Sequence, residues 1–253
     1  MEKKITIVTP VFNGRKYLDN TINSVLIQTY KNIEYIIIDG GSTDGSREII
    51  EKYRDKVSKI IFQNDNSMYE AIETGFKSAT GEYYYWINSD DFFLDNGSVE
   101  RLMKVINKKE YNWVICKIAI SKNKEKPKIY IPLVYPQWIL KYGFANDCFW
   151  GFVQQENTIF SKKLYMKVNG INSNFKIMGD YDLWKRFAHF EKLIPLNIKY
   201  ACHRKNEQQL SLDVEKSYAE IGKKKCKFNI FYPLRFLLSI IYFSVLKLKL
   251  TSS

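Results

Sequence analysis

The chain has 253 residues, 45% of them hydrophobic, which is enough to bury the core of one α/β domain with an appendage or of two small domains. A formal net charge of +12 favours an anionic partner, such as nucleic acid, an acidic lipid surface or a phosphorylated substrate. Lysines gather before an apolar C-terminal stretch, and no nucleic-acid-binding motif is recognisable, so a membrane surface is favoured and no nucleic-acid partner is expected.

The first hundred residues alternate between strand and helix patterns. Strands are expected at residues 5–11, 34–38, 57–62 and 83–87, and helices at 46–53, at 68–77 and around the apolar face of Leu18, Ile22, Val25 and Leu26. This alternation predicts a parallel, three-layer sheet whose ligands bind beyond the carboxyl ends of the strands. Asp39 and the pair Asp90 and Asp91 lie at such ends.

The pattern of the following residues is less regular. A helix is expected at residues 97–107, strands at 113–120 and 128–131, and an aromatic-rich stretch at 135–152 is interpreted as acceptor-shaping. Further on, Leu183, Phe187 and Phe190 predict a helix that begins just after Asp180 and Asp182.

The C-terminal stretch has a different composition. From Phe228 to Leu250 it is rich in Phe, Leu, Ile and Tyr, but its longest uncharged run, residues 236–246, is only about half of the ~20 residues that span a bilayer. We therefore expect an amphipathic helix in the headgroup region of an anionic leaflet, or alternatively a terminal helix docked on the protein's own core. The predicted domains are residues 1–212, with a donor half at 1–107 and an acceptor half at 108–212, and a tail at 213–253.

The four cysteines, Cys116, Cys148, Cys202 and Cys226, are widely spaced and form no CxxC pair. No apolar signal segment is found at the start of the sequence. The expectation is therefore a cytoplasmic chain with free thiols.

Residues 86–91 end an apolar run with two adjacent carboxylates, Asp90 and Asp91. Hard cations such as Mg²⁺ and Mn²⁺ take one or two carboxylates from protein and complete their shell with water and phosphate, so this pair could hold a metal against a diphosphate. The alternative is a polar turn. A dinucleotide-binding domain is disfavoured because residues 9–14 lack the GxGxxG that lets a backbone approach a pyrophosphate.

Taken together, residues 9–14 (TPVFNG), 39–46 (DGGSTDGS), 79–82 (ATGE) and 88–91 (NSDD) resemble the family 2 glycosyltransferases of GT-A fold, an α/β fold with a mostly parallel central sheet. The resemblance covers roughly residues 3–212. Residues 154–160 and 179–184 are similar to the branch that acts in bacterial O-antigen, capsule and exopolysaccharide synthesis.

The resemblance implies a UDP-sugar donor and a Mn²⁺ or Mg²⁺ ion. The donor residues that it implies are Thr9, Pro10 and Val11 at the base, Asp39 at the uracil ring, Asp65 in the pocket and Asp90 at the ribose. Asp91 would bind the metal ion. His203 would complete the coordination shell of the metal, and Arg204 would contact the diphosphate. For His203 and Arg204 a solvated or capping role is the alternative.

The resemblance also implies that Asp180 is the catalytic base, with Asp182 as the rival. Gln155, Glu156 and Trp184 belong to the expected acceptor region. The expected reaction is an inverting transfer of one sugar to a lipid-linked, polyprenyl diphosphate acceptor at the inner membrane face. A non-catalytic nucleotide-sugar-binding or membrane-binding module of the same fold is the alternative. Departures from the family pattern at Asn66, Glu70, Glu73 and Thr74 leave the donor sugar open, and the sequence does not indicate the oligomeric state.

Overall fold

The structure is a computed structural model that describes residues 2–122, 125–146, 149–206, 209, 213–224 and 231–251, with side chains in the last helix described up to residue 245. Cys148, Cys226, Phe228 and the expected domain boundary after residue 212 lie outside the described residues. Cys116 and Cys202 are buried free thiols.

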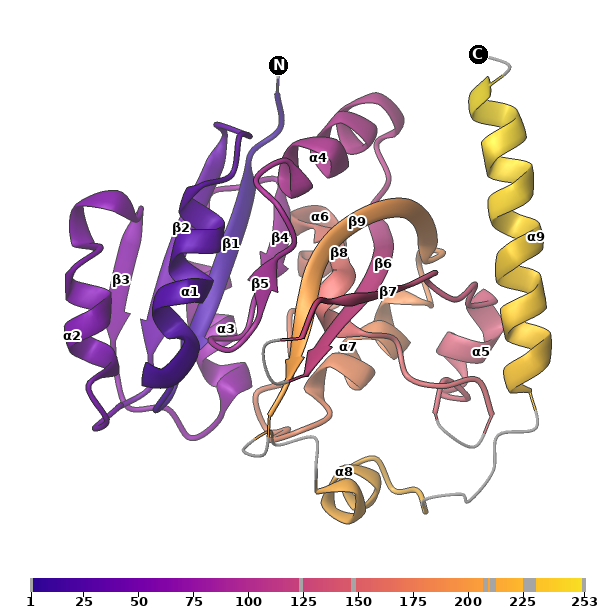
Figure 1. Cartoon of the computed structure of the whole chain (residues 1–253). Helices are drawn as coiled ribbons and strands as arrows, with labels where there is room; N and C mark the ends of the chain where they lie inside the picture. Colours follow the sequence, from indigo (N-terminus) through magenta and orange to yellow (C-terminus); the bar gives the residue numbers. More distant parts are fainter. Residues whose placement is uncertain are drawn as a thin grey trace.

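The first half of the chain forms the expected parallel, helix-flanked sheet (Figure 1). Its elements are β1 (Ile5–Val11), α1 (Arg15–Leu26), β2 (Ile33–Asp39), α2 (Ser46–Glu51), β3 (Lys59–Phe62), α3 (Met68–Lys77) and β4 (Tyr83–Trp86). Strands β2 and β4 pair in parallel with the two edges of β1, and every residue of β1 is buried. A strand that is covered on both faces has a nearly continuous apolar sequence, and such runs made these strands predictable from the sequence. Val11 and Asp39 are register partners at the carboxyl ends of β1 and β2.

The second half adds strands of both directions. Its elements are β5 (Phe92–Phe93), α4 (Ser98–Lys109), β6 (Trp113–Lys122), β7 (Lys128–Tyr130), α5 (Gln137–Lys141), β8 (Thr158–Ser161), α6 (Lys162–Lys167), α7 (Gly179–Phe187), β9 (Ile194–Lys205), α8 (Val214–Glu220) and α9 (Tyr232–Thr251). Within the described residues the strand order is β3-β2-β1-β4-β8-β6-β9-β5, and β7 pairs with β6. Strand β8 runs antiparallel to both β4 and β6, so it joins the two halves into one sheet. The parallel arrangement therefore holds for the first half, and the second half is mixed.

The predicted start of the helix near residue 183 was wrong by one turn. Helix α7 begins at Gly179, so Asp180 and Asp182 lie in its first turn. Carboxylates are favourable there because the N-terminal N–H groups and the helix dipole stabilise negative charge. Leu183 and Phe187 are buried as expected, but Phe190 lies beyond the helix and is exposed.

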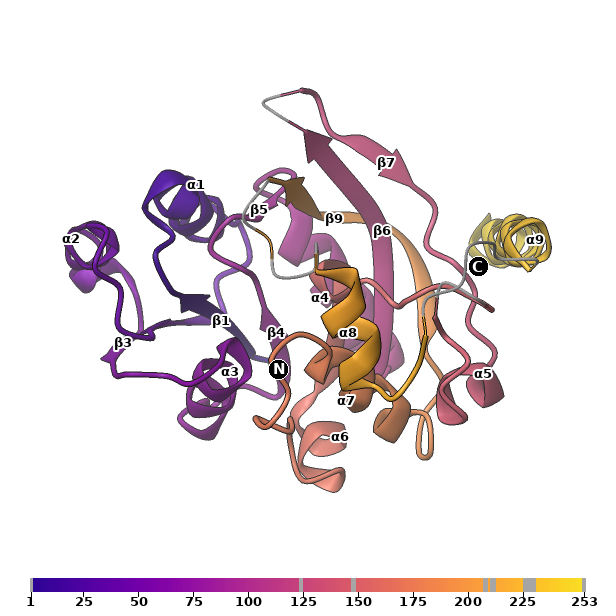
Figure 2. The ribbon, with the colours of Figure 1, turned by 90° about the horizontal axis from the view of Figure 1, so that it is seen from below.

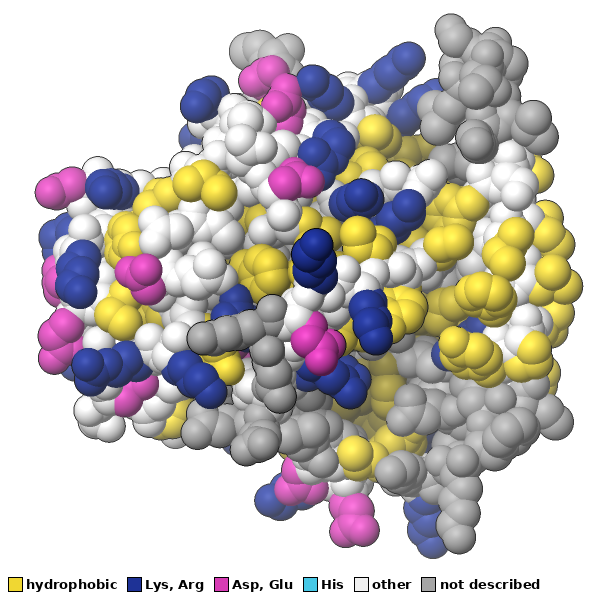
Figure 3. Space-filling view, viewed as in Figure 1, with side chains coloured by type: hydrophobic (Ala, Val, Ile, Leu, Met, Phe, Trp, Pro, Cys, Tyr) yellow, Lys and Arg dark blue, Asp and Glu magenta, His cyan; other side chains and the backbone are white. Residues whose placement is uncertain are grey.

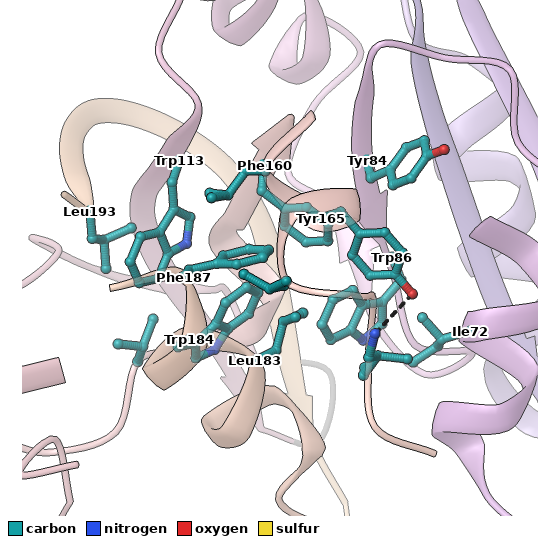
Figure 4. Close-up of a cluster of buried hydrophobic side chains, with 14 of the residues drawn as sticks. Ile72, Tyr84, Trp86, Trp113, Phe160, Tyr165, Leu183, Trp184, Phe187 and Leu193 are labelled. Carbon is teal, nitrogen blue, oxygen red and sulfur yellow. Dashed lines mark hydrogen bonds between the residues drawn. The ribbon is translucent and has the colours of Figure 1, made fainter. Parts of the chain in front are cut away.

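A cluster of aromatic side chains packs α7 against the sheet (Figure 4). The ring of Trp184 stacks at 5.8 Å between centroids on Trp86 of β4 and at 5.8 Å on Trp113 of β6. Trp184 is 2% exposed, so its main contacts are in the core. This packing fixes the first turn of α7, which carries Asp180, relative to the end of β4.

Replacing Trp184 by Ala should lower the free energy of unfolding by about 3–5 kcal/mol, because it leaves a large cavity among the stacked rings. Chemical denaturation measures this change. Trp138→Ala, at an exposed tryptophan, is the matched control and should change stability by about 0.5 kcal/mol or less. A stable Trp184→Ala protein that had lost only acceptor binding would contradict the core role.

Helix α9 is packed along one side of the molecule, beside α5 (Figures 1 and 2). In the described part of the chain no helix is both long enough and apolar enough to cross a membrane. Ser239 of α9 is buried and accepts a hydrogen bond from the backbone N–H of Val134 at 2.8 Å. Helix α9 thus contacts the rest of the protein through Ser239, while most of its apolar side chains face outward.

Candidate active site

Two loops after β1 and β2 hold each other at the carboxyl edge of the sheet. Asn13 adopts a left-handed conformation with φ of 51°, which Asn tolerates better than most residues. Its backbone N–H donates to Ser42 Oγ at 2.9 Å, and its side-chain Oδ1 accepts from the Thr43 N–H at 2.9 Å. The N–H of Gly14 donates to Ser46 Oγ at 2.9 Å. These bonds explain why the polar residues of the 9–14 and 39–46 motifs occur together.

Asp39 is completely buried beneath these loops. Its Oδ1 accepts from the N–H groups of Gly41 and Ser42 and from Arg47 Nε at 2.7 Å. Within the described residues, its Oδ2 has no hydrogen-bond partner, and the same is true of Oδ2 of Asp65. Burial raises the pKa of Asp65, and the charge of Asp39 contributes to the rise. A buried acceptor atom without a partner, such as Oδ2 of Asp65, can receive an N–H donor from a ligand.

A cavity of about 590 Å³ lies at this edge. Its walls include Pro10, Val11, Phe12, Gly40, Asp65, Tyr69, Asn88, Asp90, Gln155, Glu156, Lys176, Asp180 and His203. Among the expected base-pocket residues, Pro10, Val11 and Asp65 line it. Thr9 and Asp39 lie behind the wall, and Thr9 Oγ1 is 3.0 Å from Tyr35 Oη inside the sheet.

A second cavity, of about 510 Å³, adjoins the first. Its own walls include Ile120, Leu140, Ala145, Phe152, Val153, Tyr181, Trp184, Lys185 and Lys205. The two cavities share wall residues from several elements, namely Gln155, Glu156, Ile177, Asp180, His203, Asn206 and Gln209. The expected acceptor residues Gln155, Glu156 and Trp184 all border the second cavity.

Asp90 is held by residues that follow β9. Asn206 Nδ2 donates to Asp90 Oδ2 at 2.6 Å, and Gln209 Nε2 donates to the same oxygen at 3.2 Å. Gln209 belongs to residues 208–211, which follow His203 and Arg204 and are similar to a family segment near the diphosphate. Asn206 was not expected in the site from the sequence, and its one signal was its position just after His203 and Arg204.

Asp91, Glu156 and His203 lie close together; Glu156 and His203 belong to the wall that the two cavities share, and Asp91 lies behind it. Nδ1 of His203 lies 3.1 Å from Glu156 Oε1 and 3.5 Å from Asp91 Oδ1. Asp91 is completely buried, and its oxygens accept from the backbone N–H of Arg204 at 2.9 Å and from Asn88 Nδ2 at 3.2 Å. One ligand atom from each member of the triad lies within 4.8 Å of the others. The structure thus brings Asp91 and His203 together as expected and adds Glu156, which the sequence analysis had assigned only to the acceptor region.

The three groups perturb one another strongly. Burial raises the pKa of Asp91 to about 7, although His203 acts in the opposite direction. Burial lowers the pKa of His203, but the carboxylates of Asp91 and Glu156 outweigh it and raise this pKa to about 11. A metal ion bound by these three groups would compete with the proton that the raised pKa of His203 favours.

The donor set fits a divalent metal. Two carboxylate oxygens and one imidazole nitrogen suit Mn²⁺ well, while Mg²⁺ would rely more on the oxygens and on water. Among the described residues, Nδ1 of His203 is buried without a hydrogen bond of good geometry, so this atom is available as a ligand.

Asp180 lies on the shared wall of the two cavities. Its Oδ1 accepts from the Tyr181 N–H at 2.8 Å and from Tyr69 Oη at 3.3 Å. Burial raises the pKa of Asp180 to about 7, and the charge of Glu156 adds to the effect. Asp182, its rival, instead forms an ion pair with Arg186 at 2.7 Å and lines neither cavity.

Arg204 does not point into either cavity. Its guanidinium lies 4.4 Å from the ring centroid of Tyr17 and donates to Asn20 Oδ1 at 2.6 Å. Its contribution to the site is its backbone N–H, which holds Asp91. Lys16 and Lys176, which the sequence analysis did not single out, supply positive charge to the wall of the first cavity.

A model of glycosyl transferase family 2 matches residues 6–168, which is more than half of the chain. The chain belongs to this family. It is 26% identical over 235 residues to an uncharacterized glycosyltransferase of Rickettsia prowazekii (strain Madrid E), covering 86% of this chain and 70% of that protein. It is 29% identical over 198 residues to a similar protein of Rickettsia typhi, covering 72% of this chain and 58% of the relative, so it spans little more than half of that protein.

Solved structures show the same fold. The TarS 1-349 structure from S. aureus in complex with UDP-GlcNAc superposes with a TM-score of 0.68 at 17% identity, covering 86% of this chain and 64% of that one. The mannosyltransferase PcManGT from Pyrobaculum calidifontis, in complex with GDP-Man and Mn²⁺, superposes with a TM-score of 0.64 at 13% identity, covering 96% of this chain and 70% of that one. The GT-A fold expected for this family 2 member is confirmed.

Proposed function

We propose that this family 2 protein is a metal-dependent, inverting glycosyltransferase that moves a single sugar from a UDP-sugar to a lipid-linked oligosaccharide. The observation that carries the proposal is the position of Asp180 on the wall between two adjoining cavities. A base there can reach an acceptor in one cavity while a donor occupies the other. The proposed setting is bacterial surface polysaccharide synthesis at the cytoplasmic face of the cell membrane.

The first cavity suits the donor. Its volume of about 590 Å³ is within the usual range of ligand pockets. Pro10, Val11 and Asp65 form the end proposed for the uracil, with Asp39 behind them, and Asp90 is the proposed partner of the ribose. The UDP and UDP-GlcNAc complexes of TarS support a uridine nucleotide here, because the two proteins share the fold.

The part of this cavity lined by Glu156 and His203 suits the diphosphate. A Mn²⁺ or Mg²⁺ ion held there by Asp91, Glu156 and His203 would stabilise negative charge on the departing diphosphate. The Mn²⁺ complex of PcManGT supports this choice of cofactor. Asn88 and the Arg204 N–H fix the Asp91 carboxylate, and Lys16 and Lys176 add positive charge nearby.

The second cavity suits the acceptor. Asp180 takes the proton of an acceptor hydroxyl while the hydroxyl oxygen attacks the anomeric carbon, and the bond from that carbon to the diphosphate oxygen breaks. Attack from the face opposite the leaving group inverts the anomeric configuration. Apolar walls, including Leu140 and Phe152, with Lys185 and Lys205 beside them, fit a glycan that is joined through diphosphate to a lipid.

Release of free UDP from a panel of UDP-sugars tests this function. One sugar should be hydrolysed slowly with Mn²⁺ and without acceptor, and a chelator should stop the release until metal is restored. Chelator-insensitive release would contradict the metal requirement. Absence of both release and binding across the panel would contradict the uridine donor, and the same assay with GDP-mannose would then identify a guanosine donor.

A further inference from the structure

Helix α9 presents polar side chains to the protein and apolar side chains to its surroundings. Arg235 and Ser239, one turn apart, are only 9% and 1% exposed. Arg235 Nη1 donates to the Trp150 carbonyl, and Ser239 Oγ both receives the Val134 N–H and donates to the Arg235 carbonyl at 2.9 Å. These bonds fix the rotation of the helix about its axis, so its outward face is defined.

The outward face of α9 is almost entirely apolar. Leu237 and Ile241 are 53% and 50% exposed, and Leu234, Phe236, Ile240 and Val245 are also exposed. Between residues 232 and 245 the one charged side chain is Arg235, which is turned inward. Figure 3 shows hydrophobic side chains gathered over this helix. A helix docked merely to cover the core would have the opposite orientation.

The apolar surface continues beyond α9. Phe231, just before the helix, lies 4.1 Å from Phe149 between ring centroids, and Phe149 in turn contacts Trp138 of α5 at 6.1 Å. Trp138 and Phe144 are exposed. We call the surface formed by Trp138, Phe144, Leu237 and Ile241 the outer apolar face. It combines segments about a hundred residues apart in the sequence, and large apolar patches of this kind mark interaction sites.

The charge around this face indicates its partner. Lys141 ends α5, which carries Trp138. The exposed Lys126 and Lys128 lie just before and at the start of β7, on the segment that leads to Val134, the residue bonded to Ser239 of α9. Two copies meeting through the face would bring these lysines together in a chain of net charge +12. An anionic lipid layer instead accepts both the apolar side chains and the lysine ammonium groups.

We propose that the outer apolar face is a rigid membrane-contact surface that seats the protein on anionic lipid, with α9 lying in the headgroup region. This membrane contact rests on the proposed function, because that function is what makes the acceptor a lipid-linked glycan. Leu140 lines the second cavity, and Trp138 of the same helix belongs to the outer apolar face. The lipid part of an acceptor can thus stay in the membrane while its sugar enters the cavity.

Co-sedimentation of the full chain with phosphatidylglycerol-containing vesicles tests the proposal. The Leu237→Ser/Ile241→Ser double variant and the Trp138→Ser variant should each partition about tenfold more weakly, because each removes apolar contact with the lipid. The matched control is Ile27→Ser/Met166→Ser, at residues that are 60% and 61% exposed outside the face, and it should bind like the wild type. Neutral phosphatidylcholine vesicles should bind all forms weakly.

Undiminished vesicle binding by both variants of the face would overturn the proposal. It would also be overturned by a wild type that is dimeric and fails to bind vesicles, with Leu237→Ser/Ile241→Ser becoming monomeric; the face would then join two copies. UDP release without acceptor needs no membrane and should be unchanged in every variant. Loss of vesicle binding by the variants of the face, with normal UDP release, supports the surface. The same loss of vesicle binding with no UDP release by any form, the wild type included, would contradict the proposed function alone.

Discussion

Asp180→Asn should lower turnover by about 10²- to 10⁴-fold, the usual contribution of a positioned base, while leaving donor affinity nearly unchanged. The amide keeps the size of the carboxylate and can still accept from Tyr69 and the Tyr181 N–H, but it cannot take a proton. Steady-state transfer rates and calorimetric titration with UDP separate the two effects. The expected result is a fall in kcat with little change in UDP affinity.

The pH profile gives a second readout of the same assignment. Because burial raises the pKa of Asp180 to about 7, the base is half protonated near neutral pH, and kcat/KM should rise as pH increases through this value. Asp91 has a pKa in the same region, but a bound metal keeps it ionised. The pH profiles of kcat/KM at two saturating Mn²⁺ concentrations should therefore coincide. If the pH midpoint of the profile moved with the Mn²⁺ concentration, the titrating group would be Asp91.

Asp182→Asn is the matched control for Asp180→Asn. It removes a carboxylate from the same helical turn, but one that pairs with Arg186 rather than lining a cavity. Turnover should stay within a few-fold of the wild type. Full activity of Asp180→Asn, or equal loss in both variants, would show that the base had been assigned wrongly.

Asp91→Asn should abolish the metal-dependent part of donor binding. The substitution removes one of two anionic ligands, so we expect UDP affinity with Mn²⁺ to fall by at least about 100-fold, more than typically follows loss of a residue that only supports a metal ligand. Calorimetry with UDP, with Mn²⁺ or with chelator, measures the change. In chelator, the variant and the wild type should bind UDP alike.

Glu156→Gln distinguishes the metal cluster from a general electrostatic effect. If Glu156 is a ligand, its substitution should also reduce the Mn²⁺ enhancement of UDP binding. Asp95→Asn, at a carboxylate paired with Arg101 outside both cavities, should not. An Asp91→Asn protein in which Mn²⁺ enhanced binding as strongly as in the wild type would contradict the metal assignment.

The positions of the first acids could be predicted because parallel strands place their carboxyl ends at one edge. Asp39 ends the buried strand β2, and Asp90 and Asp91 follow the buried strand β4; the apolar runs of both strands are plain in the sequence. The same local reasoning predicted helix α3 and the burial of Leu18, Ile22 and Val25.

The partners contributed by the second half could not be predicted in this way. Glu156 reaches His203 because β8 and β9 flank β6 in opposite directions, and this order depends on packing between distant segments. Arg204 is turned toward Tyr17 by a contact across more than 180 residues of chain, which no local pattern reveals. Trp184 likewise lay in a motif of the resemblance, but its position is set by the stacked rings of Trp86 and Trp113.

The two adjoining cavities also affect how specificity can change. Apart from the shared wall and Lys176, the first cavity is built by residues 10–90, whereas the second is built by residues 120–205. Substitutions at Leu140, Phe152 or Lys185 can therefore reshape the second cavity without touching the first. Chains of this architecture could exchange one acceptor for another while keeping the donor, so that a diversity of glycan linkages could arise by variation of the second half alone.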